Sequence, residues 1–181
     1  MEIEHEGDDG MVNLPAFVFF ECTSLQEYSI PESVKTIGEY AFRGCTSLRG
    51  QMYSSDVIPQ GIEEIGEGAF RDCMSITQVS IPGTVSEIQT YAFYDCISLE
   101  EVVLSEGIEH IYNYAFHNCS SLTSVTIPDS VERIGVDAFS ECNDLTNLTI
   151  GNSVKNIGGN AFRNCSGLTS VTIPDSVNII G

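Results

Sequence analysis

Seven cysteines are the residues of this sequence with the clearest capacity for chemistry. Their successive separations are 23, 28, 23, 23, 23 and 23 residues. Thiols can form disulfides, ligate zinc or pack as small apolar groups. A fixed spacing in this range is typical of stacked structural repeats, so the role of the thiols depends on the elements that carry them. The cysteines are Cys22, Cys45, Cys73, Cys96, Cys119, Cys142 and Cys165.

The residues around each cysteine recur with the same period. The repeat reads L-x-x-V-x-I-P-x-S-V-x-x-I-G-x-x-A-F-x-x-C-x-x and covers 23 residues. Val125 and Ile127 alternate with polar residues, which predicts a half-buried strand. Pro128 then ends the strand, because proline lacks the N–H of a continuing ladder. The V-x-x-I-G piece predicts a second short extended segment, and A-F-x-x-C predicts one tight helical or 3₁₀ turn that points Phe and Cys inward.

One such unit is too small to bury its own apolar residues, but stacked units bury them against one another. The sequence therefore predicts a mainly β repeat solenoid. Its parallel strands should lie about 4.8 Å apart along one face.

The segment from Leu122 to Leu145 resembles the BspA-like class of leucine-rich repeats, and the resemblance extends from Leu14 to the C-terminus. The resemblance implies a right-handed leucine-rich-repeat coil, with its parallel sheet on the concave face and short extended or 3₁₀ segments opposite. It also implies a surface or secreted protein that binds other proteins or matrix.

The repeat pattern predicts the domain organisation. Residues 1–13 form an acidic flexible tail, and residues 14–181 form the solenoid with a degenerate N-terminal cap and seven repeat starts. One repeat is longer because of an insertion at 49–57, and the last stops in mid-repeat at Gly181. An apolar edge without a polar cap predicts end-to-end self-association of the chain.

The stacking also predicts the role of the cysteines. Equivalent thiols of stacked coils point the same way, which suits neither disulfide geometry nor the convergent ligands of a zinc site. We therefore expect buried, reduced thiols that act as small apolar groups. We expect His5 to lie in the tail and His110 and His117 to face solvent. No motif predicts a catalytic residue, a metal site or a cofactor.

Charge and hydropathy narrow the function classes. The chain has 26 acidic and 7 basic residues, a net charge of −19, and 20 of the acids precede residue 121. This charge opposes nucleic-acid binding. With 42% apolar residues and a mean hydropathy of +0.05 the chain should fold. We expect no membrane span and no signal peptide. The absent signal and the reduced cysteines favour the cytoplasm, whereas the family resemblance suggests the surface.

Two features are candidate binding sites for a protein partner. The insertion offers Met52, Tyr53 and Asp56 as contacts. The solvent side of the predicted strands changes from acidic and mixed to uncharged toward the C-terminus, and solenoids use such faces to bind partners. The sequence thus favours a non-enzymatic interaction scaffold; the alternative is a cell-surface adhesin for glycan or matrix if an export signal was lost. The strand candidates are Glu27, Ser29, Gln78, Ser80, Glu101, Val103, Ser124, Thr126, Asn147, Thr149, Ser170 and Thr172.

Overall fold

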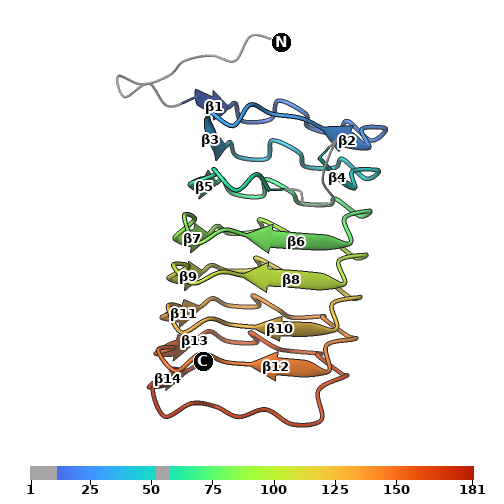
Figure 1. Cartoon of the computed structure of the whole chain (residues 1–181). Coiled ribbons are helices and arrows are strands. Elements are labelled where there is room, and N and C mark those ends of the chain that lie inside the picture. Colours follow the sequence, from blue (N-terminus) through green and yellow to red (C-terminus); the bar gives the residue numbers. More distant parts are fainter. Residues whose placement is uncertain (1–11, 52–57) are drawn as a thin grey trace.

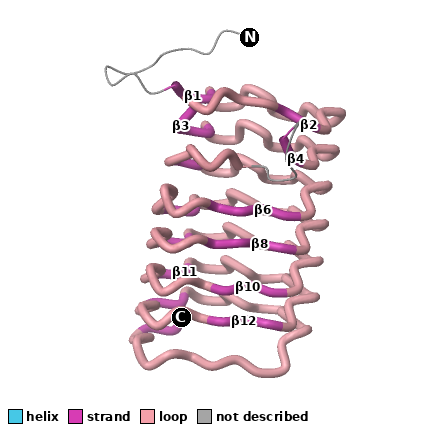
Figure 2. Tube along the Cα trace, in the orientation of Figure 1, coloured by secondary structure: helices cyan, strands magenta, loops and turns pink. Residues whose placement is uncertain are grey.

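A computed structural model describes residues 12–51 and 58–181 of the chain. In these residues the chain winds into a β-solenoid with one coil for each cysteine, and it contains strands and turns but no helix (Figure 1). Each coil devotes only a few residues to strands, and loops or turns make up the rest (Figure 2). The mainly β repeat solenoid predicted from the sequence is confirmed.

All strand pairs are parallel, and they form four separate ladders. The sheet on the near side of Figure 1, ordered β12-β10-β8-β6, contains β6 (Gln78–Ile81), β8 (Glu101–Leu104), β10 (Ser124–Thr126) and β12 (Asn147–Thr149). A second sheet, ordered β14-β13-β11-β9-β7, contains β7 (Glu87–Ile88), β9 (His110–Ile111), β11 (Arg133–Ile134), β13 (Asn156–Ile157) and β14 (Ile179–Ile180). The N-terminal ladders are β1 (Val12–Leu14) with β3 (Val34–Ile37) and β5 (Glu64–Ile65), and β2 (Glu27–Tyr28) with β4 (Gly50–Gln51).

The register of the sheets follows the sequence repeat. Val125 pairs with Leu148, and Ile134 pairs with Ile157, so equivalent residues of neighbouring coils stand side by side. The V-x-x-I-G piece forms the second sheet, as predicted. Because the register equals the repeat length, each apolar column of the sequence becomes one continuous column of the core.

A stack of phenylalanines runs through the centre of this core. Phe116 is fully buried, and its ring centroid lies 5.3 Å from Phe93 and 5.1 Å from Phe139. Ala, Leu, Ile and Cys columns surround the stack and are almost entirely buried. Each ring therefore packs on the equivalent rings of the coils before and after it, which is the contact that a single repeat lacks. The stack comprises Phe19, Phe42, Phe70, Phe93, Phe116, Phe139 and Phe162.

The A-F-x-x-C segment differs from the helical or 3₁₀ turn expected for it. Its residues do form i→i+3 bonds, such as His117 N–H to Tyr114 O at 3.2 Å. However, Tyr114 and Asn118 have positive φ angles of 59° and 55°, which interrupt any helix. The alternate N–H groups instead bond to the next coil, as Phe116 N–H does to Ala138 O at 2.8 Å. The inward direction of Phe and Cys is as predicted.

A second prediction, a strand in the last coil, is wrong. The strand predicted at Ser170 and Thr172 is absent, and residues 169–173 make no backbone hydrogen bond to β12. A cavity of about 390 Å³ separates this segment from Leu148, Thr149 and Ile150. Among the described residues no further coil packs on this segment, so Val171 and Ile173 remain 48% and 43% exposed. The equivalent residues of the coil that contains β10, Val125 and Ile127, are almost fully buried, so this segment gains much less stabilisation from apolar burial than β10 does.

Two predicted features lie largely or wholly outside the described residues. Met52, Tyr53 and Asp56 of the insertion fall within residues 52–57. Most of the predicted acidic tail falls within residues 1–11. The first described strand, β1, begins at Val12 and pairs with β3.

Candidate interaction surfaces

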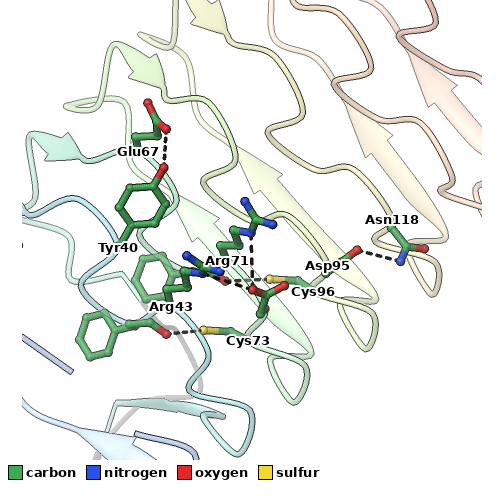
Figure 3. A network of polar contacts seen from close by, with 11 residues as sticks. Tyr40, Arg43, Glu67, Arg71, Cys73, Asp95, Cys96 and Asn118 are labelled. Carbon is green, nitrogen blue, oxygen red and sulfur yellow. Dashed lines mark hydrogen bonds and ion pairs between the residues drawn. The ribbon is translucent and has the colours of Figure 1, made fainter. Parts of the chain in front are cut away.

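The cysteines form a hydrogen-bonded ladder inside the solenoid. Six of the seven are buried, and all seven are free thiols. Each buried Sγ donates to a phenylalanine carbonyl of the preceding coil, as Cys119 does to Phe93 O at 3.3 Å; Cys73 and Cys96 make the same contact in Figure 3. The thiol thus fills a small apolar space and also donates a hydrogen bond to a buried carbonyl oxygen, a combination that alanine lacks.

Burial keeps the thiols in the middle of the ladder protonated, whereas the hydrogen bond with Cys142 lowers the pKa of Cys165 at its end. Burial raises the pKa of Cys45 to about 11, and it raises the pKa of Cys73 and of Cys119 well above the ordinary value of 9.0. A nucleophile or metal ligand needs the thiolate, so the ladder has a structural character. Cys22 is the exception to the predicted burial: it is exposed, because it belongs to the first coil.

The different exposure of the thiols predicts their reactivity. In the native protein one thiol, Cys22, should react with an aromatic disulfide reagent within seconds, while the other six react only as the fold opens. Unfolding in denaturant without reductant should release all seven. Fewer than six reactive thiols in the unfolded protein would show that the cysteines are bridged.

Eight of the twelve predicted strand candidates form two outward columns on the β6–β12 sheet, which we call the strand face; Gln78 and Ser80 in it are half-buried and the other six are exposed. One column contains Gln78, Glu101, Ser124 and Asn147, and the other contains Ser80, Val103, Thr126 and Thr149. The inward neighbours along the same strands are apolar, which confirms the predicted alternation.

The strand face also changes character along the solenoid. Glu101 is the single charged residue in the two columns of the strand face, and Val103 is an apolar side chain that is 45% exposed. The outward residues of β10 and β12 all have hydroxyl or amide side chains. Of the remaining candidates, Glu27 and Ser29 are exposed at the separate β2–β4 ladder. Ser170 and Thr172 are exposed but lie across the cavity from β12.

A further surface, which the sequence did not reveal, lies on the A-F-x-x-C turns. Side chains just before and just after the A-F pair stack from coil to coil: Tyr91 lies 5.2 Å from Tyr114, and Tyr94 lies 4.7 Å from His117 between ring centroids. We call this set the aromatic column. It comprises Phe17, Phe20, Tyr40, Arg43, Arg71, Tyr91, Tyr94, Tyr114 and His117.

Two arginines are inserted into the aromatic column. The Arg43 guanidinium carbon lies 5.3 Å from the Phe20 centroid, and that of Arg71 lies 4.6 Å from the Tyr94 centroid. The two side chains lie close together in Figure 3, and the Nε of each is 3.5 Å from the same Asp72 carboxylate oxygen. Tyr40 donates a hydrogen bond to Glu67. This bond is the first cause of the raised pKa of Tyr40.

The backbone shows that the rings are not required by the fold. The residue before each A-F pair has a positive φ, which Gly, Asn and Asp adopt most readily. Gly68, Asp137 and Asn160 occupy this slot in three coils. In four others the slot holds an aromatic residue, at a cost of about 1–2 kcal/mol for the left-handed conformation. Those residues are Phe17, Tyr40, Tyr91 and Tyr114.

The two described histidines are less exposed than expected. His117 stacks on Tyr94, and its Nδ1 lies 2.6 Å from Ser140 Oγ. The Nδ1 of His110 is buried without a hydrogen-bond partner. In the part of the chain that the structure describes, no group of three or more His, Cys, Asp or Glu side chains is placed to hold a metal ion. The same part contains no helix long and apolar enough to cross a bilayer.

These features define a class: a parallel-sheet repeat solenoid whose outward side chains vary while its core columns do not. The sequence matches the BspA type leucine rich repeat region in six copies, over residues 12–143 and 63–181. The chain therefore belongs to the BspA-type leucine-rich repeat family. No curated protein matches it.

Solved structures agree with this assignment. The chain is similar to the leucine-rich repeat protein of T. pallidum, with 33% identity, a TM-score of 0.77, and coverage of 88% of this chain and 73% of that one. It is also similar to a leucine-rich repeat protein from Eubacterium ventriosum, with 26% identity, a TM-score of 0.73, and coverage of 85% and 40%. A protein from Bacteroides ovatus shares the fold at 23% identity and a TM-score of 0.69, with coverage of 93% and 51%. The chain thus spans about half or less of the last two proteins.

Proposed function

We propose that this protein is a non-enzymatic scaffold that binds a protein partner on its strand face. The observation that supports this most is the contrast between the two sides of the same strands. The inward residues of β6, β8, β10 and β12 are all apolar, whereas the outward residues differ from strand to strand. In a repeat protein the core fixes the inward residues, so ordered, exposed and variable positions are free to specify a partner.

The composition of the strand face fits a protein ligand. Hydroxyl and amide groups both donate and accept hydrogen bonds, so they can meet the mixed polar groups of a protein surface. Val103 adds an exposed apolar contact near the centre of the face. Each of these side chains contributes only a small contact, so the affinity for a partner depends on many of them in both columns acting together.

Charge insertion tests this proposal. A partner is first identified by capture and purified, and its affinity is then measured by calorimetry for the wild type and for the double variant Ser124→Arg/Asn147→Arg. Two bulky cations in one column should weaken binding by at least about 100-fold, as expected when a central contact region is blocked. The control is Ser86→Arg/Asn178→Arg, which adds the same charge at exposed positions flanking the second sheet. Equal affinities for the two double variants would refute the proposal.

The same experiment separates the two classes of ligand. If the strand-face variant instead loses binding to a purified glycan, while no protein partner is retained, the protein is an adhesin. In that case the strand face would be the binding site, as proposed, but its ligand would be a glycan and not a protein.

The last coil supports a proposal of self-association. Ile179 and Ile180 are 59% and 66% exposed on β14, which forms the edge of the second sheet. Edges of this kind pair with other chains unless they are charged or covered. We expect dimers or short oligomers at high concentration in multi-angle light scattering, and a monomer for Ile179→Lys/Ile180→Lys. A wild-type chain that stays monomeric at millimolar concentration would contradict this.

A further inference from the structure

Two exposed apolar side chains occupy the same repeat position in neighbouring coils, just before the strand face begins. Met74 is 40% exposed and Ile97 is 38% exposed. Each follows a buried cysteine and stands four residues before β6 or β8. The turns that lead into these two strands lie on the right-hand side of Figure 1. We call Met74 and Ile97 the apolar rim.

The fold does not require apolar residues at this position. The other coils place a hydroxyl or amide residue there, and several hydroxyls link neighbouring coils: Ser120 Oγ donates to Ile97 O at 3.4 Å, and Ser166 Oγ donates to Asn143 O at 3.1 Å. Methionine and isoleucine side chains cannot donate this bond, and they expose apolar surface to water instead. Stability therefore does not explain the apolar rim. The residues at this position in the other coils are Thr23, Thr46, Ser120, Asn143 and Ser166.

The apolar rim is close in the fold to the apolar residue of the strand face. Away from the first and last coils, the described chain exposes four large apolar side chains, and three of them belong to the coils of β6 and β8. Isolated apolar side chains are normal on a protein surface, whereas a group of them marks an interaction site. The four are Met74, Ile97, Val103 and Val136.

Two carboxylates lie between Ile97 and Val103 in the same coil. Glu100 and Glu101 are exposed, and neither takes part in an ion pair among the described residues. No cation stands at the equivalent positions of the two neighbouring coils, so a cation of a partner could approach both carboxylates. Those positions hold Thr77, Gln78, Thr123 and Ser124.

We propose that the apolar rim and Val103 are the anchor points of the strand face, and that they bind a protein segment with apolar side chains on both sides of an arginine or lysine. The apolar side chains cover the rim and Val103, and the cation lies against Glu100 and Glu101. Apolar anchors supply most of the affinity in such contacts, and the carboxylates select against acidic segments. This inference rests on the proposed function, because it names the kind of partner that the strand face accepts.

A phage-displayed library of random short peptides provides the probe, with the full chain as the immobilised target. Peptides that carry arginine or lysine between apolar residues should be enriched. One enriched peptide is then synthesised, and its affinity is measured by calorimetry. Enrichment of acidic peptides, or of no peptide at all, would overturn the inference.

The double variant Met74→Thr/Ile97→Ser removes the apolar rim. It should fold, because Thr46 and Ser120 occupy this position in the coils on either side. Its affinity for the peptide should fall at least about tenfold, as expected when an anchor is lost. Its midpoint of urea unfolding should stay the same or rise, since two hydroxyls replace exposed apolar groups. Unchanged affinity, or a clear loss of stability, would contradict the proposal.

The matched control is Val136→Thr. Val136 is 39% exposed but lies outside the strand face, and Thr90 occupies the equivalent position two coils earlier. This variant should bind the peptide as the wild type does. A second variant, Glu100→Gln/Glu101→Gln, should weaken binding at low salt more than at high salt, where screening already reduces the attraction. Equal effects at both salt concentrations would show that the carboxylates do not contact the cation.

The strand-face variant Ser124→Arg/Asn147→Arg separates this inference from the proposed function. If it blocks the peptide while Met74→Thr/Ile97→Ser does not, the strand face binds a partner but its anchor points are not those proposed. If neither double variant changes the affinity, the inference and the proposed function both fail.

Discussion

Replacement of Phe116 by alanine should lower the free energy of unfolding by about 3–5 kcal/mol, the usual cost of truncating a fully buried phenylalanine. Phe116 is fully buried, and rings stack on both of its faces, with Phe93 at 5.3 Å and Phe139 at 5.1 Å. Its loss removes contacts to two coils at once. Equilibrium unfolding in urea, followed by circular dichroism, measures this change.

The control is the same substitution at the end of the stack. Phe162 is partly buried and stacks on one ring only, Phe139 at 5.6 Å. Phe162→Ala should therefore cost about half as much, because one of its two coil contacts is missing already. In a solenoid, stability resides in the interfaces between neighbouring coils. Equal losses for the two variants would show that the stack does not carry stability in this way.

Alkaline pH should unfold the protein through its thiols. Burial holds the pKa of Cys73, Cys96 and Cys119 above the ordinary value of 9.0, so the folded state retains protons that the unfolded state loses. Stability is therefore complete below pH 9 and falls as the pH rises. Each such thiol contributes a slope of about 1.4 kcal/mol per pH unit, or about 4 kcal/mol per unit for the three together. Cys45 follows the same direction up to its pKa of about 11.

Urea unfolding at pH 8, 9 and 10 checks this dependence, at an ionic strength that screens the net charge. Cys119→Ala is the control: it is less stable at pH 8, but its stability should decline less steeply above pH 9 because one titrating thiol is gone. A slope that is the same in the wild type and in Cys119→Ala would assign the alkaline unfolding to tyrosines or to general repulsion.

The repeat architecture could be predicted from the sequence because one 23-residue period determines which residues stack on one another. The cysteine spacing and the apolar columns around Phe116 reappear in the structure as the register between coils, such as Val125 with Leu148. The strand face was predicted for the same reason: alternation along a strand assigns Thr126 and Thr149 to the outside. Both results need only local periodicity and the requirement to bury apolar groups.

Other features could not be predicted because they depend on contacts between coils. The A-F-x-x-C segment was expected to form a helical or 3₁₀ turn, but alternate N–H groups bond to the next coil and its backbone passes through positive φ at Tyr114 and Asn118. The strand expected at Ser170 is absent although its sequence repeats that of β10, and its apolar neighbours Val171 and Ile173 are 48% and 43% exposed; β14 in the same coil still pairs with β13. The aromatic column could not be predicted because Tyr91 and Tyr114 occupy a repeat position whose residue type differs from coil to coil, which in the sequence is typical of a loop.

Mapping of the bound partner by photocrosslinking tests the central claim of a strand-face interaction most directly. A benzophenone amino acid is placed in turn at Val103, Thr126 and Thr149, which form one column of the strand face, and at Ser86 and Asn178 flanking the second sheet. The proposed function predicts crosslinks to the partner from the strand-face positions and none from Ser86 or Asn178. Crosslinks from Ser86 or Asn178, with none from the strand face, would contradict it.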